Sequence, residues 1–142
     1  MSFPQPSINS YALITGASQG IGEAMARDFA KAGYNLIIVA RRDDVLQKIA
    51  AELEDAHGVE VIVAAKDLSV AEQVDELIAL IDEKAISICV NSAGIASFGP
   101  FMNQDWDYET NQYNLNATAV FRITKAAVSY THLRAHETKA NL

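Results

Sequence analysis

The sequence predicts an α/β fold in which helices cover a doubly wound parallel sheet. Short runs rich in isoleucine and valine alternate with longer amphipathic stretches, which is the pattern of repeated strand–helix units. The short runs are apolar at consecutive positions, as strands buried on both faces are. The first run also leads into a glycine-rich turn, Thr15–Gly22, and then into a helical pattern. These three observations predict one α/β domain over residues 1–126.

The apolar runs and the amphipathic stretches set the expected elements in order. The runs predict strands at residues 11–15, 35–40, 59–64 and 86–91. The amphipathic stretches predict helices at residues 20–32, 43–57, 70–84 and 107–126. The sheet is therefore expected to stop after its fourth strand and the following long helix, which leaves the domain incomplete at its C-terminal end.

Stop and start signals support these helix boundaries. Gly33 and Gly58 stand where glycines commonly end helices. Ser69 predicts the N-cap of the third helix, and Glu72 three residues later completes a capping box.

The composition limits the classes of function. The chain has 142 residues, of which 50% are hydrophobic and 20% charged, as in globular proteins. Its net charge of −7 argues against a nucleic-acid partner. No apolar run approaches the roughly 18 residues of a membrane span. The one cysteine, Cys89, is expected as a buried thiol, which fits a cytoplasmic protein.

The turn Thr15–Gly22 carries three glycines at GxxxGxG spacing between a strand and a helix. Glycine adopts positive φ and lets a backbone approach a ligand closely. A helix start offers unpaired N–H groups and a partial positive charge to a phosphate. The turn therefore predicts a pyrophosphate site in a Rossmann-type first βα unit.

Two arginines follow the second predicted strand, where an acidic residue would normally hold a ribose 2′-hydroxyl. Arg41 and Arg42 instead match a 2′-phosphate through charge-assisted hydrogen bonds, which favours NADP over NAD. The alternative is that both guanidinium groups are simply solvated. Asp43 and Asp44 come later and are expected to cap the next helix.

Polar motifs also follow the third and fourth predicted strands, at the sheet edge where such folds bind ligands. The motifs are Asp67-Leu68 and Asn91-Ser92-Ala93-Gly94. Asp67 could alternatively cap the following helix, and Asn91 could bond its own backbone in a turn. Their common register with one sheet favours a binding role for both.

The glycine turn, both later motifs and Asn116 on the long helix together resemble the short-chain dehydrogenase/reductase family over residues 10 to 126. This resemblance implies that a stretch of the glycine turn wraps the cofactor's phosphates and adjoining ribose, namely Gly16, Ser18, Gln19, Gly20, Ile21 and Gly22. It implies that Arg41 and Arg42 take the 2′-phosphate and that Asp67 and Leu68 contact the adenine. Asn91, Ala93 and Gly94 would line the nicotinamide side. Ser92 departs from the family, which often has a second asparagine there.

The resemblance also implies a catalytic asparagine that holds a water in a proton relay. Asn116 fits its usual setting, with Phe121 and Thr124 following, and Asn114 is the alternative. The family's catalytic Ser and Tyr-x-x-x-Lys pair are not expected in this chain. Tyr130 is followed by Arg134 at the lysine position, and it lies too close to Asn116.

Residues 128–142 resemble sequencing-adaptor DNA translated in frame, so residues 127–142 are expected to be a non-native tail. His132 and His136 in this tail make only two possible ligands, and no metal site is expected. Together these features predict an NADP(H)-dependent oxidoreductase that acts on a small carbonyl or alcohol. This chain alone is expected to be inactive. The longer parent is expected to form homo-oligomers. The alternative is a non-catalytic nucleotide-binding protein of the same fold.

Overall fold

Four short apolar segments form a parallel sheet in the computed structural model, which describes residue 6 and residues 9–137. They are β1 (Ser10–Thr15), β2 (Asn35–Ala40), β3 (Val61–Ala65) and β4 (Ala85–Asn91). Their order across the sheet is β3-β2-β1-β4, so the chain builds outward on one side of β1 and then crosses to the other. The predicted doubly wound parallel sheet is confirmed.

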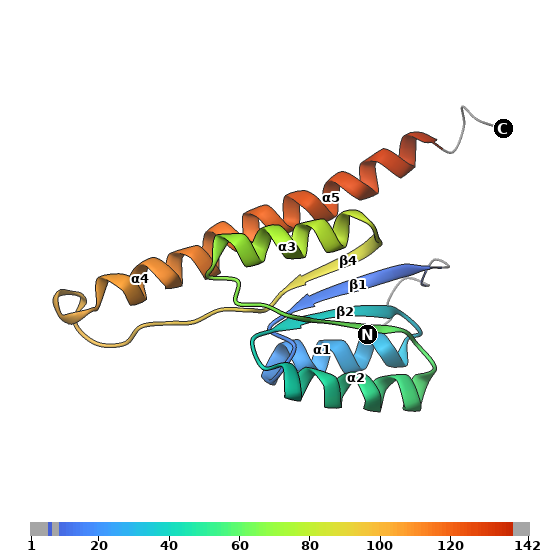
Figure 1. The fold of residues 1–142 in the computed structure, drawn as a ribbon, viewed down its shortest axis with the longest axis horizontal. Helices are drawn as coiled ribbons and strands as arrows, with labels where there is room; N and C mark the ends of the chain where they lie inside the picture. The colour runs from blue at the N-terminus through green and yellow to red at the C-terminus, as the bar shows by residue number, and fades with distance from the viewer. Residues whose placement is uncertain (1–5, 7–8, 138–142) are drawn as a thin grey trace.

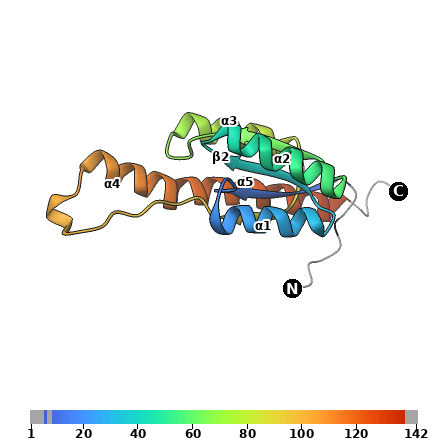
Figure 2. The same cartoon turned by 90° about the horizontal axis from the view of Figure 1, so that it is seen from below.

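Helices cover both faces of this sheet, as Figures 1 and 2 show. One face is covered by α1 (Gly20–Lys31) and α2 (Asp43–His57), and the other by α3 (Ala71–Asp82) and α5 (Val120–Glu137). The short η1 (Phe101–Asn103), α4 (Trp106–Tyr113) and the π-helical turn η2 (Asn114–Ala119) lie between β4 and α5. The loop after β4 and α4 project beyond the carboxyl edge of the sheet (Figure 1).

The central strand β1 is buried along its whole length, because both of its faces are covered. Ala12 and Ile14 pack in the core under α1 and α2. Tyr11 and Leu13 pack in the second core under α3 and α5. Successive side chains of a strand point to opposite faces, so consecutive apolar residues supply two cores at once.

Two predicted caps are wrong in the structure. Val70 occupies the N-cap of α3 without a capping side chain, and the hydroxyl of Ser69 donates a hydrogen bond to Asp67 Oδ1 at 2.7 Å. A local carboxylate that engages a serine hydroxyl removes it from capping. At α2 the N-cap is Arg42, and Asp43 with Asp44 forms the acidic first turn. Both carboxylates still favour the positive helix start.

The long helix extends further than its predicted end near residue 126, because α5 continues to Glu137. The sequence contains no glycine or proline after Pro100, so no residue of the helix-stopping kind interrupts it. Residues 138–142 of the expected tail lie outside the described residues. The described side chains end at Val128, so those of Tyr130, His132 and His136 lie outside them as well.

Cys89 is half-buried, not fully buried as expected. It lies on β4, the edge strand next to β1, so its side chain is covered less than those of β1. Burial raises the pKa of the Cys89 thiol above its usual value. Among the described helices, none combines the length and apolarity that crossing a membrane requires.

A buried phenol anchors the start of β1 to the segment before β3. Tyr11 Oη donates a hydrogen bond to Glu60 Oε2 at 2.6 Å, and this bond to a carboxylate raises the pKa of Tyr11 to about 12. Lys84 Nζ lies 5.6 Å from the centroid of the same ring. The phenol can donate this bond only while it is protonated.

We predict that Tyr11→Phe lowers the free energy of unfolding at pH 7 by about 1 kcal/mol, because it removes this hydrogen bond. The pKa of Tyr11 is raised on folding, so the bond contributes fully below pH 10 and is lost as the pH rises through about 12. Urea unfolding of both proteins between pH 7 and 12 measures the difference. The phenylalanine keeps the ring beside Lys84, so the two proteins differ only in the phenol hydroxyl. A difference in the free energy of unfolding that stays constant from pH 7 to 12 would contradict the prediction.

Candidate functional site

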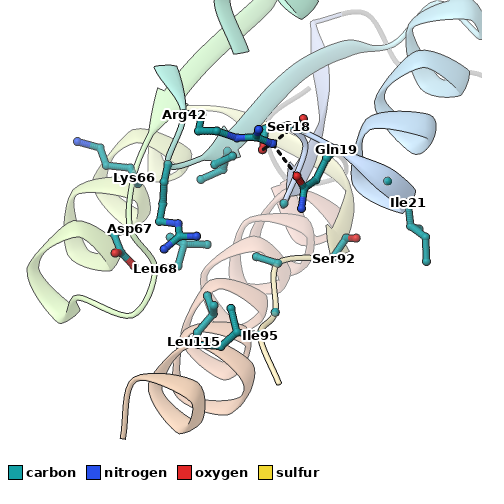
Figure 3. A pocket seen from close by; sticks show the side chains of 17 residues that line it. Ser18, Gln19, Ile21, Arg42, Lys66, Asp67, Leu68, Ser92, Ile95 and Leu115 are labelled. Carbon is teal, nitrogen blue, oxygen red and sulfur yellow. Dashed lines mark hydrogen bonds between the residues drawn. The ribbon is translucent and has the colours of Figure 1, made fainter. Parts of the chain in front are cut away.

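The carboxyl ends of all four strands surround one cleft, a cavity of about 770 Å³ (Figure 3). It lies where the strand order reverses between β1 and β4, the usual ligand site of doubly wound sheets. Eleven of the predicted cofactor-binding residues line it: Gly16, Ser18, Gln19, Gly20, Ile21, Arg41, Arg42, Asp67, Leu68, Ala93 and Gly94. The structure therefore brings most of the predicted residues together around one space.

Two glycines of the turn are required by close backbone packing. A Cβ on Gly16 would lie 2.8 Å from backbone atoms of Ser92 and Ala93, and Gly16 also has a φ of +70°. A Cβ on Gly22 would lie 2.3 Å from the carbonyl oxygen of Gly16. Gly22 itself does not line the cavity. It allows the first turn of α1 to press against the glycine turn, and so places that helix start at the cleft.

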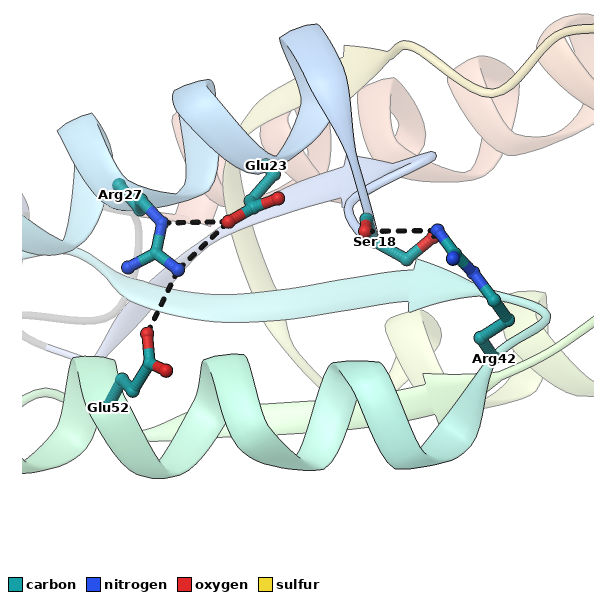
Figure 4. Close-up of polar contacts among 5 residues, drawn as sticks. All are labelled: Ser18, Glu23, Arg27, Arg42 and Glu52. Atoms are coloured by element: carbon teal, nitrogen blue, oxygen red, sulfur yellow. Dashed lines mark hydrogen bonds and ion pairs between the residues drawn. The ribbon is translucent and has the colours of Figure 1, made fainter.

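The N-terminus of α1 offers backbone donors to the cleft. Its N-cap residue, Gln19, makes no side-chain hydrogen bond to the helix. The acidic residue of the first turn, Glu23, pairs with Arg27 at 2.9 Å, and Arg27 also pairs with Glu52 at 2.9 Å (Figure 4). An anion at this helix start would therefore meet backbone N–H groups and a positive helix end.

The two arginines after β2 have different surroundings. Arg42 Nη2 donates to Gln19 Oε1 at 2.7 Å and to the hydroxyl and carbonyl oxygens of Ser18 at 3.1 and 3.2 Å (Figures 3 and 4). Arg41 is exposed and makes no hydrogen bond or ion pair with a residue that the structure describes. Arg42 thus ties α2 to the glycine turn, and the guanidinium of Arg41 is available to a ligand.

The loop after β3 combines a turn with an apolar wall. Asp67 Oδ1 accepts hydrogen bonds from the backbone N–H and the hydroxyl of Ser69, at 3.0 and 2.7 Å. Leu68 is buried and lines the cavity. Lys66 also lines it and pairs with Glu76 of α3. One oxygen of Asp67 therefore serves the local turn.

Thr15 joins the glycine turn to the loop after β4, a role that was not predicted from the sequence. Its buried Oγ1 accepts hydrogen bonds from the N–H groups of Ser92 and Ala93, each at 3.1 Å. The signal was a hydroxyl residue at the last position of β1, beside Gly16. Because the two strand ends are hydrogen-bonded through one side chain, the central part of the cleft floor is held together.

Two further predicted residues lie outside the cavity lining. Asn91 Nδ2 donates to Thr124 Oγ1 of α5 at 3.0 Å, which ties the end of β4 to that helix. Asn116 lies in the π-helical turn η2, and its amide bonds both the N–H and the carbonyl of Ile95, at 3.0 and 2.7 Å. Single π-turns inside long helices are frequent at functional sites. The alternative residue, Asn114, begins the same turn.

Six lining residues are not among those that the sequence assigned to the cofactor, although Ser92 belongs to a predicted motif: Val39, Ala40, Lys66, Ser92, Ile95 and Leu115. Most of them lie next to a predicted motif, so their position at the end of a predicted strand could have indicated them. Leu115 comes from η2, far along the chain, and no local pattern marks it. Among the described residues, no group of histidine, cysteine and acidic side chains could hold a metal ion.

Comparison with known proteins identifies the family of this chain. The family model described as short chain dehydrogenase matches residues 10–138. The chain belongs to the short chain dehydrogenase family. Residues 10–138 include the whole sheet and every residue that lines the cleft.

Individual members of the short chain dehydrogenase family agree with this assignment. Very-long-chain 3-oxoacyl-CoA reductase-A of Danio rerio is 29% identical over 134 residues, which cover 92% of this chain and 42% of that protein. A short-chain dehydrogenase from Sphingobium yanoikuyae, solved with NADPH, is 37% identical with a TM-score of 0.80, covering 83% of this chain and 47% of that one.

A bulky-bulky ketone specific alcohol dehydrogenase from Comamonas testosteroni is 32% identical to this chain, with a TM-score of 0.84. The match covers 87% of this chain and 50% of that enzyme. The chain thus spans about half the length of the relatives that it matches.

We predict that Gly22→Ala lowers the free energy of unfolding by about 3 kcal/mol, because its Cβ would clash with the Gly16 carbonyl. The matched control is Gly58→Ala, at a φ of +67° with no atom within 4 Å of the added Cβ. Only backbone strain of about 1 kcal/mol is expected there. Urea unfolding measures both values, and equal losses would show that the close approach at Gly22 is not the cause.

Proposed function

We propose that this chain forms the cofactor-binding part of an NADP(H)-dependent short-chain oxidoreductase. The proposed reaction moves a hydride between the nicotinamide and a small carbonyl or alcohol substrate. The observation that carries the proposal is that Arg41 and the start of α1 at Gln19 line one cleft, and that the Arg41 guanidinium has no hydrogen-bond or ion-pair partner among the residues that the structure describes. A helix start that suits an anion and an arginine available to a ligand, in one cleft, suit a dinucleotide with a third phosphate.

The residues of the cleft fit this cofactor from one end to the other. The first-turn backbone near Ser18 and Gly20 would hold the pyrophosphate. Leu68 would cover the adenine, with Asp67 beside it, and Gly94 would lie on the nicotinamide side. When bound, the nicotinamide supplies or accepts the hydride, and the protein positions it.

The two arginines would divide the recognition of the 2′-phosphate. Arg42 already donates to Ser18 and Gln19, so its main contribution is to fix the glycine turn next to α2. Arg41 would make the main charge-assisted contact with the phosphate. The NADPH complex of the Sphingobium yanoikuyae relative supports this choice of cofactor.

The proton chemistry needs residues beyond those in the cleft. We propose that Asn116 is the catalytic asparagine. From its place in the π-helical turn η2 it would hold a water of the proton relay. None of the five tyrosines has a lysine four positions later, so the sequence contains no Tyr-x-x-x-Lys pair. The alternative is a non-catalytic nucleotide-binding protein of the same fold. A longer gene that encodes a serine and a Tyr-x-x-x-Lys pair downstream would favour the enzyme.

The proposed partners are a small carbonyl or alcohol and further copies of the longer protein, and the proposed location is the cytoplasm. We also propose that residues 127–142 are a non-native extension of residues 1–126. Reading the source locus through codon 142 tests this point, since an uninterrupted native frame would contradict it.

We predict that Arg41→Gln weakens NADPH binding by about tenfold or more, because a charged hydrogen-bond donor to the 2′-phosphate is lost. The affinity for NADH, which lacks that phosphate, should change by less than about twofold. Calorimetric titration of both nucleotides measures the effect, with the exposed Lys48→Gln of α2 as the control for lost charge. Equal affinity of the unchanged chain for NADPH and NADH would contradict the NADP assignment, and binding of neither would contradict the function.

We predict that the chain alone does not turn over NADPH with a panel of aldehydes and ketones. A bare tyrosine with a pKa near 10 is a poor acid or base at neutral pH, and the sequence supplies no lysine partner to lower it. The measurement is the absorbance of NADPH over time. A steady loss that depends on both chain and carbonyl would contradict the prediction.

A further inference from the structure

The loop that leaves β4 has an unusual source of hydrogen bonds. Residues 92–100 form no strand or helix, so their backbone groups need other partners. Six hydrogen bonds to the backbone of residues 95–99 come from side chains spaced four apart. These side chains are Gln104, Tyr108, Gln112 and Asn116.

The spacing places Tyr108, Gln112 and Asn116 along one row of α4 and η2, and Gln104 precedes this row. Residues four apart on a helix are neighbours on the same face, and each step advances about 6 Å along the axis. The first of them, Gln104, lies just before α4, and Asn116 lies in η2. At the two ends of the row the backbone partners run in the opposite direction, with Ile95 bonded to Asn116 and Gly99 bonded to Gln104. We call this row the 104–116 column.

The hydrogen bonds of the column are 2.6 to 3.3 Å long. Gln104 Nε2 donates to the carbonyls of Phe98 and Gly99 at 2.9 and 3.3 Å. Tyr108 Oη donates to the carbonyl of Ala96 at 3.2 Å. Gln112 Oε1 accepts from the N–H of Ser97 at 2.6 Å, the shortest of these contacts.

Gln112 is held in place as well as holding the loop. Its Nε2 donates to Glu109 Oε2 at 3.4 Å, which orients Oε1 toward Ser97. Two residues before Ser97 comes Ile95, which lines the cleft together with Gly94. Without the Gln112 bond, the loop beyond Ile95 would lose its central attachment to the helix.

We propose that Gln112 is a positioning residue for the nucleotide cleft. It acts through Ser97 to keep the wall at Gly94 and Ile95 in the place that the bound nucleotide needs. This inference rests on the proposed function. The wall adjoins parts that NADPH and NADH share, so loosening it affects both nucleotides equally, unlike a change at Arg41.

The first experiment compares nucleotide affinity in Gln112→Leu and in a matched control, Asn111→Leu. Asn111 neighbours Gln112 on α4, is exposed, and makes no side-chain hydrogen bond with a residue that the structure describes. Gln112→Leu should weaken NADPH and NADH binding by the same factor, about three- to tenfold, because one ordering hydrogen bond is lost. Asn111→Leu should leave both affinities unchanged.

The second experiment exchanges the two polar partners in Glu109→Gln/Gln112→Glu. The new glutamate keeps an acceptor for the Ser97 N–H, and the new glutamine keeps a donor beside it. This double variant should recover the affinity lost in Gln112→Leu. Amide hydrogen exchange of residues 95–97 gives a readout without nucleotide, and it should be faster in Gln112→Leu but not in the double variant.

The outcomes separate this inference from the proposed function. If the unchanged chain binds neither nucleotide, the proposed function fails, and the cleft role of Gln112 fails with it. If the chain binds NADPH and Gln112→Leu binds equally well, only the inference is overturned. Unchanged hydrogen exchange at residues 95–97 also overturns it, since the loop would then not depend on Gln112.

Discussion

The close approach between the glycine turn and the loop after β4 organises this molecule. Gly16 leaves no room for a Cβ beside Ser92 and Ala93, and Thr15 Oγ1 accepts hydrogen bonds from both of their amides. Gly22 then brings α1 against the same turn. These contacts set the floor of the cleft, the start of the helix and the end of β4 relative to one another.

That approach is possible because β1 is central and buried on both faces. Helices on both sides hold it through alternate side chains, so its carboxyl end has little freedom. The chain then passes to β2 and β3 on one side and to β4 on the other. The reversal at β1 leaves a gap between the loops of neighbouring strands, and in this gap the cleft forms.

Hydrogen bonds of side chains hold the walls of the cleft on both sides. Arg42 ties α2 to Ser18 and Gln19, and the 104–116 column ties the loop after β4 to its helix. In both places a side chain forms hydrogen bonds with atoms of a turn or loop that the helices and strands leave without a partner. Arg41, which has no hydrogen-bond or ion-pair partner in the described part of the chain, therefore lines a cleft whose two sides are already held.

The sequence by itself determined the order of strands and helices, the parallel sheet and most of the cleft. Apolar periodicity and glycine positions are local, and carboxyl ends of parallel strands must share one edge. Tertiary structure alone decided which polar groups bind one another. Thr15 of β1 binds the amides of Ser92 and Ala93 after β4, and Asn91 at the end of β4 binds Thr124 of α5. Gln112 of α4 binds the N–H of Ser97 in the loop after β4. Such partners depend on distances across the fold, which no local pattern in the chain encodes.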